Sequence, residues 1–117
     1  MSEKTELPAK VYAAFNRREI ETVLPALAPD VDWPNGMEGG RVHGRAAVRD
    51  YWTRQFALVR SHVEPVNFKT GEDGRILVEV HQVVHDKIGQ LLSDQRVHHI
   101  YTIRNGLIHR MEIRKPE

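Results

Sequence analysis

The sequence contains no cysteine, which excludes disulfides, thiolate nucleophiles and cysteine-based zinc sites. Its longest apolar run is a few residues, far short of the roughly 20 that a membrane-spanning helix needs. Neither sign of charge is in excess, because 17 Lys and Arg are interspersed with 16 Asp and Glu and leave a net charge of +1. The chain therefore lacks the basic stripe of a nucleic-acid-binding protein. Because its N-terminus is polar, unlike a secretory signal, we expect a cytoplasmic protein.

What the chain does have is enough apolar sequence to fold. Hydrophobic residues make up 40% of its 117 residues and charged residues 28%, which is typical of a globular protein. This length corresponds to a single domain over residues 1–117.

The most informative stretch lies near the C-terminus and predicts a long β-hairpin. Alternation places Val97, His99, Tyr101 and Ile103 on one face of the first strand. The dipeptide at 105–106 is Asn-Gly, which readily supplies the positive φ angles of a tight hairpin turn. This pair of strands can serve as the floor of a sheet.

The rest of the chain predicts helices first and strands afterwards. Apolar spacing predicts helices at 6–16, 19–27 and 45–60, and strands at 31–33, 63–69, 75–86, 91–104 and 107–114. Pro65 indicates an edge position or a bulge in its strand. Helices followed by a run of strands favour an α+β fold, with the helices packed on one face of a curling sheet.

Four local stretches, with their order and spacing, resemble the SnoaL-like and ketosteroid-isomerase-like families of the nuclear transport factor 2-like superfamily. These stretches are residues 11–16, 27–33, 44–52 and 104–108. The resemblance implies a cone-shaped, curved antiparallel or mixed sheet wrapped around three N-terminal helices, as in a cystatin-like roll. It also implies a deep apolar pocket for a small hydrophobic molecule, and commonly a homodimer through the outer face of the sheet.

The resemblance argues against steroid isomerisation. The position of the ketosteroid isomerase base is occupied by Trp33, and that of its oxyanion-hole tyrosine by Val11. The position of its protonated aspartate falls close to His99. The acid that related cyclases carry on the last strand falls near Ile113.

Three polar residues are the catalytic candidates. The resemblance aligns Glu79 and His81 with an Arg and Asp pair of related hydrolases, and alternation puts both on one strand face. Together with His99 they are expected to perform general acid–base catalysis, with Glu79 orienting His81. The competing interpretation places Glu79 and His81 on the outer face, because residues 76, 78 and 80 on the other face are aliphatic. For His99 the competing interpretation is a buried side chain that makes a hydrogen bond and has no catalytic role.

The remaining expectations concern ligands. Substrate-binding candidates are aromatic residues and methionines: Trp33, Met37, Trp52, Phe56, Tyr101 and Met111. A metal site would need His81, His99 and His109 to converge, and we expect neither a metal nor another cofactor.

Three functions stay open at this point. The first is an isomerase, cyclase or hydrolase acting on a small hydrophobic substrate. The second is a ligand-binding domain that has lost the catalytic acids of its relatives. The third is an oligomerisation module that uses an apolar outer face of the sheet.

Overall fold

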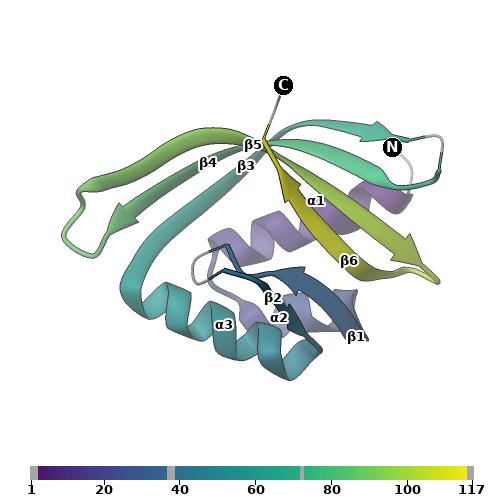
Figure 1. The fold of residues 1–117 in the computed structure, drawn as a ribbon, viewed down its shortest axis with the longest axis horizontal. Helices are drawn as coiled ribbons and strands as arrows, with labels where there is room; N and C mark the ends of the chain where they lie inside the picture. Colours follow the sequence, from purple (N-terminus) through teal and green to yellow (C-terminus); the bar gives the residue numbers. More distant parts are fainter. Residues whose placement is uncertain (1–2, 37–38, 72, 116–117) are drawn as a thin grey trace.

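The computed structural model describes residues 3–36, 39–71 and 73–115. Its helices are α1 (Glu3–Asn16), α2 (Ile20–Val23), the short 3-10 helix η1 (Leu24–Ala26) and α3 (Arg45–Leu58). Its strands are β1 (Leu27–Pro34), β2 (Arg41–His43), β3 (Val59–Thr70), β4 (Ile76–Asp86), β5 (Leu91–Arg104) and β6 (Leu107–Arg114). Figure 1 shows a curved sheet with the helices together on its hollow side.

The strands form one sheet in the order β2-β1-β6-β5-β4-β3. Strand β1 runs parallel to β6, and every other neighbouring pair is antiparallel. This confirms the predicted α+β class with a curved, mixed sheet around N-terminal helices.

Two local predictions about the backbone are confirmed. Asn105 and Gly106 have φ angles of 52° and 75° in the turn between β5 and β6, as a tight hairpin requires. Strand β3 lies at an edge of the sheet, and its register with β4 shifts between Pro65 and Asn67. Pro65 therefore occupies both situations that tolerate a missing N–H group.

The structure corrects the prediction at the other edge of the sheet. Strand β1 begins at Leu27 rather than near residue 31, and the three-residue strand β2 was not predicted. The pairing partners of Leu27 and Asp32 on β6 are Ile108 and Arg110, about 80 residues away. Local periodicity carries no information about such distant pairing, so this edge could not be derived from the alternation pattern.

The hydrophobic core lies between the helices and the hollow face of the sheet. Ile76, Val78 and Val80 on β4 are completely buried there, together with Tyr101 and Met111 from β5 and β6. Among the residues described, no helix is both long and apolar enough to cross a membrane.

Candidate functional site

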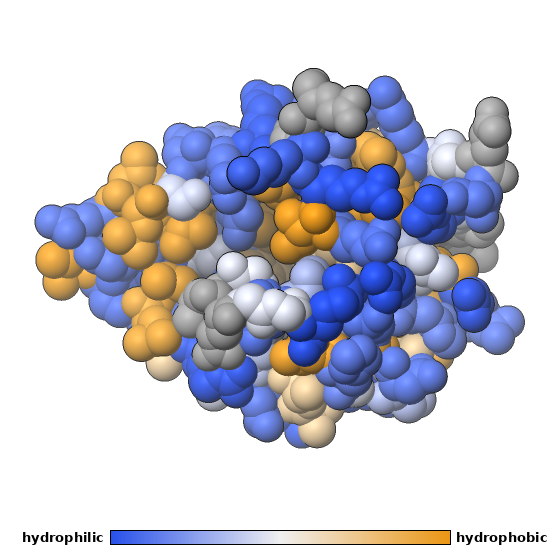
Figure 2. Space-filling model, in the orientation of Figure 1, coloured by the Kyte–Doolittle hydropathy of each residue, from blue (hydrophilic) through white to orange (hydrophobic). Residues whose placement is uncertain are grey.

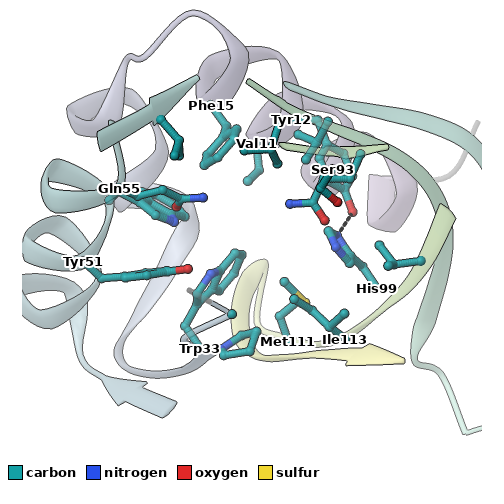
Figure 3. A pocket seen from close by; sticks show the side chains of 18 of the residues that line it. Val11, Tyr12, Phe15, Trp33, Tyr51, Gln55, Ser93, His99, Met111 and Ile113 are labelled. Carbon is teal, nitrogen blue, oxygen red and sulfur yellow. Dashed lines mark hydrogen bonds between the residues drawn. The ribbon is translucent and has the colours of Figure 1, made fainter. Parts of the chain in front are cut away.

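A cavity of about 420 Å³ lies between the hollow face of the sheet and helices α1 and α3. Val11, Tyr12 and Phe15 reach it from α1, and Tyr51 and Gln55 from α3. Figure 3 shows side chains from both helices and from the sheet arranged around an open centre. Aromatic side chains from α1, α3, β1 and β5 border this space.

Aromatic rings form the wall between α1, α3 and β1. The rings of Trp33 and Trp52 meet edge to face, with centroids 5.4 Å apart, and Phe15 meets Trp52 at 5.6 Å. Edge-to-face contacts stabilise aromatic clusters and fix the orientation of the rings. This wall offers flat apolar surfaces to a ligand.

The polar centre of the cavity is the pair Tyr12 and His99. The Tyr12 hydroxyl lies 2.8 Å from Nδ1 of His99, a hydrogen bond between α1 and β5 that joins residues 87 positions apart. His99 is only 5% exposed. Burial lowers the pKa of His99 to about 4, because the charged imidazolium is poorly solvated there. At neutral pH the ring is therefore uncharged.

The two tyrosines of this region also stay neutral. Burial, with a smaller contribution from neighbouring Tyr101, raises the pKa of Tyr12 well above its usual value. Burial likewise raises the pKa of Tyr101, and its interaction with Tyr12 offsets only part of that effect. Both side chains thus keep their hydroxyl protons as hydrogen-bond donors.

The cavity carries no formal charge in the part of the chain that the structure describes. None of the described lining residues is Asp, Glu, Lys or Arg. Its other polar groups are the side chains of Tyr51, Gln55, Gln82, Ser93 and Gln95. A charged ligand group would enter without a counter-charge, which is costly at a buried site.

The structure places Glu79 and His81 away from this cavity, which corrects the prediction that they face the pocket. Both side chains lie on the outer face of the sheet, where Glu79 is 3.8 Å from Arg96 and His81 Nε2 is 2.6 Å from Asp94. The reason is alternation: Ile76, Val78 and Val80 fill the inner face, so the residues between them point outward. The expected grouping of Glu79, His81 and His99 is not formed.

The substrate-binding candidates divide into three groups. Trp33, Trp52, Tyr101 and Met111 line the cavity, and their role in binding stays a prediction. Phe56 is instead packed outside it, with its ring 5.1 Å from that of Phe15 and under the guanidinium of Arg18. Met37 lies outside the described residues.

Sequence reasoning missed Tyr12 and Gln55 as cavity-lining residues. Tyr12 and Phe15 are three residues apart on α1, a spacing that puts them on one face of a helix. That spacing was the signal that could have identified Tyr12. For Gln55, a polar residue within the apolar stripe of α3 was the available signal.

Trp33 is held in place by a polar cluster on the opposite side of β1. The Asp32 carboxylate accepts hydrogen bonds from Arg41 on β2 and Arg110 on β6. Arg41 also donates to the backbone carbonyl of Met111. Burial alone would raise the pKa of Asp32, but these two guanidinium groups outweigh it and lower the pKa. The cluster therefore ties β1 and β2 to β6 while the carboxylate stays ionised.

No metal site accompanies the cavity within the described ranges. No three His, Asp or Glu side chains there are placed to hold an ion. In particular, His81 and His99 project from opposite faces of the sheet.

This fold is that of a SnoaL-like protein. A sequence model of the SnoaL-like domain matches residues 9–111, so the chain belongs to the SnoaL-like domain family, which confirms the resemblance. No functionally curated protein matched the sequence.

Solved structures with the same fold include three that cover almost the whole chain. TerC, co-crystallised with polyporic acid, is 28% identical over 98% of this chain and 92% of its own, with a TM-score of 0.84. An NTF2-like protein of unknown function from Burkholderia pseudomallei is 30% identical over 99% and 92%, with a TM-score of 0.83. A putative polyketide cyclase from Xanthomonas campestris pv. campestris is 28% identical over 95% and 88%, with a TM-score of 0.80.

Proposed function

We propose that this protein binds a small, uncharged, largely aromatic molecule in the cavity between the sheet and helices α1 and α3. The observation that carries the proposal is the lining itself: Trp33, Trp52 and Phe15 provide flat apolar walls, and the described lining has no formal charge. Pockets with apolar walls and a few convergent polar groups are typical small-molecule sites. The likeness to TerC, which was co-crystallised with polyporic acid, supports the binding of a small molecule by this fold.

Both tryptophans of the chain line the cavity, which gives the test a direct signal. Titration with 9-fluorenone, a planar neutral ketone, should change the tryptophan fluorescence in a saturable way. The matched control is His81→Gln on the outer face, which should bind with unchanged affinity. Absence of saturable binding by 9-fluorenone would contradict the proposal.

A second candidate function is proton transfer on the bound molecule, as in an isomerase or cyclase. It is favoured by the Tyr12–His99 hydrogen bond, which places one titratable imidazole at the cavity wall. The likeness to a putative polyketide cyclase agrees with it. In this proposal His99, and not the outer-face pair Glu79 and His81, donates a hydrogen bond to the carbonyl oxygen of the ligand and stabilises the enol that forms when solvent takes the α-proton.

Proton transfer can be tested without the natural substrate. Exchange of the α-protons of 2-tetralone for deuterium should be faster with the wild-type protein than with His99→Gln, when followed by mass spectrometry. Equal rates for both proteins, with 2-tetralone shown to bind, would leave ligand binding as the function.

A homodimer through the outer face and a cytoplasmic location stay predictions. The outer face carries the ion pairs of Glu79 with Arg96 and of His81 with Asp94. An interface of this polar kind would weaken as salt screens the charges. Sedimentation over a range of protein and salt concentrations tests it, and a monomer at all of them would contradict it.

A further inference from the structure

The imidazole of His99 has one nitrogen held by the protein and one that no described residue holds. Nδ1 is 2.8 Å from the Tyr12 hydroxyl. No hydrogen bond joins Nε2 to any described residue. In the described part of the chain, Ser61 Oγ is the one polar side-chain atom that is both fully enclosed and without a hydrogen-bond partner. Because Nε2 of His99 also has no partner there, it is not fully enclosed. The space beside the ring is the cavity.

The direction of the Tyr12–His99 hydrogen bond follows from the chemistry of the two groups. A phenol is a stronger donor than acceptor, and an imidazole nitrogen without a proton is a much better acceptor than a phenolic oxygen. The Tyr12 hydroxyl keeps its proton at all ordinary pH values, because burial raises its pKa. It can therefore donate to Nδ1 of His99 whenever that nitrogen carries no proton.

A neutral imidazole carries one proton, and the bond at one nitrogen decides where that proton resides. If Nδ1 accepts from Tyr12, the proton resides on Nε2. We infer that Tyr12 fixes His99 as the Nε2–H tautomer, so that the ring presents a hydrogen-bond donor to the cavity and selects a ligand with a neutral acceptor oxygen there.

This inference rests on the proposed ligand binding and narrows the class of ligand. Ketones, quinones and esters carry such an oxygen, whereas hydrocarbons do not, and an ammonium group would place a second donor against Nε2–H. A carboxylate would meet the donor but would be buried in a cavity whose described lining has no positive charge. The aromatic wall of Trp33 and Trp52 favours a carbonyl attached to a planar ring system.

Tyr12 is a positioning residue in this scheme, because it acts on the ligand through His99. Its role differs from that of a residue that only supports the fold. Tyr12→Phe removes the donor to Nδ1 while it keeps the ring that stacks on His99, with centroids 5.7 Å apart. The variant should therefore fold and change the tautomer.

The first test is nitrogen NMR of the histidine rings in the ligand-free protein at pH 7. The wild type should show a pyridine-type shift for Nδ1 and a pyrrole-type shift for Nε2 of His99. Tyr12→Phe should move His99 toward a mixture of both tautomers with an otherwise native spectrum. A wild-type ring protonated at Nδ1, or a tautomer unaffected by Tyr12→Phe, would overturn the inference.

The second test compares two ligands that differ in one carbonyl group, 9-fluorenone and fluorene. The preference for fluorenone over fluorene should fall roughly fivefold in His99→Phe, the usual size of one lost hydrogen bond. An unchanged preference, with both ligands bound, would overturn the inference and leave ligand binding intact. If neither ligand bound the wild type, the proposed function would fail, and the tautomer measurement would still decide the role of Tyr12.

Discussion

The two faces of the sheet are made from the same strands and have opposite chemistry. On β4 the inner face carries Ile76, Val78 and Val80, and the outer face carries Glu79 and His81. Side chains one residue apart thus differ between full burial in an apolar core and an ion pair in contact with water. Strand alternation, and not the residue type, thus decides which histidine of this chain faces the cavity.

The outer end of the β4–β5 hairpin extends this contrast. Figure 2 shows hydrophobic side chains gathered at the end of the molecule where this hairpin lies, whereas most of the same face is polar. The exposed residues there include Leu91 and Ile88, which is 82% exposed. Leu92, also exposed, contributes to the cavity lining, so the apolar tip adjoins the site.

The largest expected difference between the faces concerns stability. Ile76→Ala would leave a void in a completely buried position and should lower the free energy of unfolding by about 2–5 kcal/mol. Glu79→Gln on the outer face should change it by less than about 1 kcal/mol. Urea denaturation of both variants measures this difference, and equal losses would contradict the assignment of the faces.

The second difference concerns pH. Because burial holds the pKa of His99 near 4, the unfolded chain takes up a proton between about pH 6.5 and pH 4 that the folded chain does not. Stability should therefore fall by about 3 kcal/mol as the pH drops through this window, and this contribution should level off below it. Urea denaturation across the window measures this loss of stability. His99→Gln should largely abolish the loss, whereas His81→Gln should leave it unchanged. A wild type whose stability does not change in this window would show that His99 is not buried as a neutral ring.

The third difference concerns a charge added to each side of α3. Gln55 is buried in the cavity wall, whereas Ala57 on the same helix is exposed. Gln55→Glu should weaken binding of 9-fluorenone by about tenfold, because a charged group would be desolvated by the ligand. Ala57→Glu is the matched control and should change the affinity by less than about twofold. Fluorescence titration compares the two, and a similar loss in both would refute an uncharged cavity.

The smallest effect is expected on the outer face itself. Asp94→Asn removes the carboxylate 2.6 Å from His81 Nε2. Exposed ion pairs contribute little, so the free energy of unfolding should fall by less than about 1 kcal/mol. The same variant should leave 9-fluorenone binding unchanged. Denaturation and titration of this one variant check both statements, and a large loss of either would give the outer face a role that this account denies.

Much of the fold could be predicted from the sequence because its signals are local. The Asn105–Gly106 turn, the position of Pro65 and the alternation along residues 75–86 each depend on neighbouring residues only. The edge formed by β1 and β2 could not be predicted, because it depends on pairing with β6 across most of the chain.

The site was harder to predict than the fold for a similar reason. Hydrophobicity alone indicated that Ile76, Val78 and Val80 face the core, whereas the alignment with related hydrolases favoured Glu79 and His81 in the pocket; the structure agrees with hydrophobicity. The hydrogen bond from Tyr12 to His99 spans 87 residues and leaves no local pattern. Residues that share a strand can be grouped from a sequence, but contacts between a helix and a distant strand need the assembled fold.

The most direct test of the central claim, that the inner face of the sheet is the binding side, is NMR mapping of 9-fluorenone on the protein. Saturable shifts are expected at His99 and at the indole groups of Trp33 and Trp52, with none at His81 or Arg96 on the outer face. Shifts at His81 and Arg96, with His99 and both indoles unaffected, would contradict it.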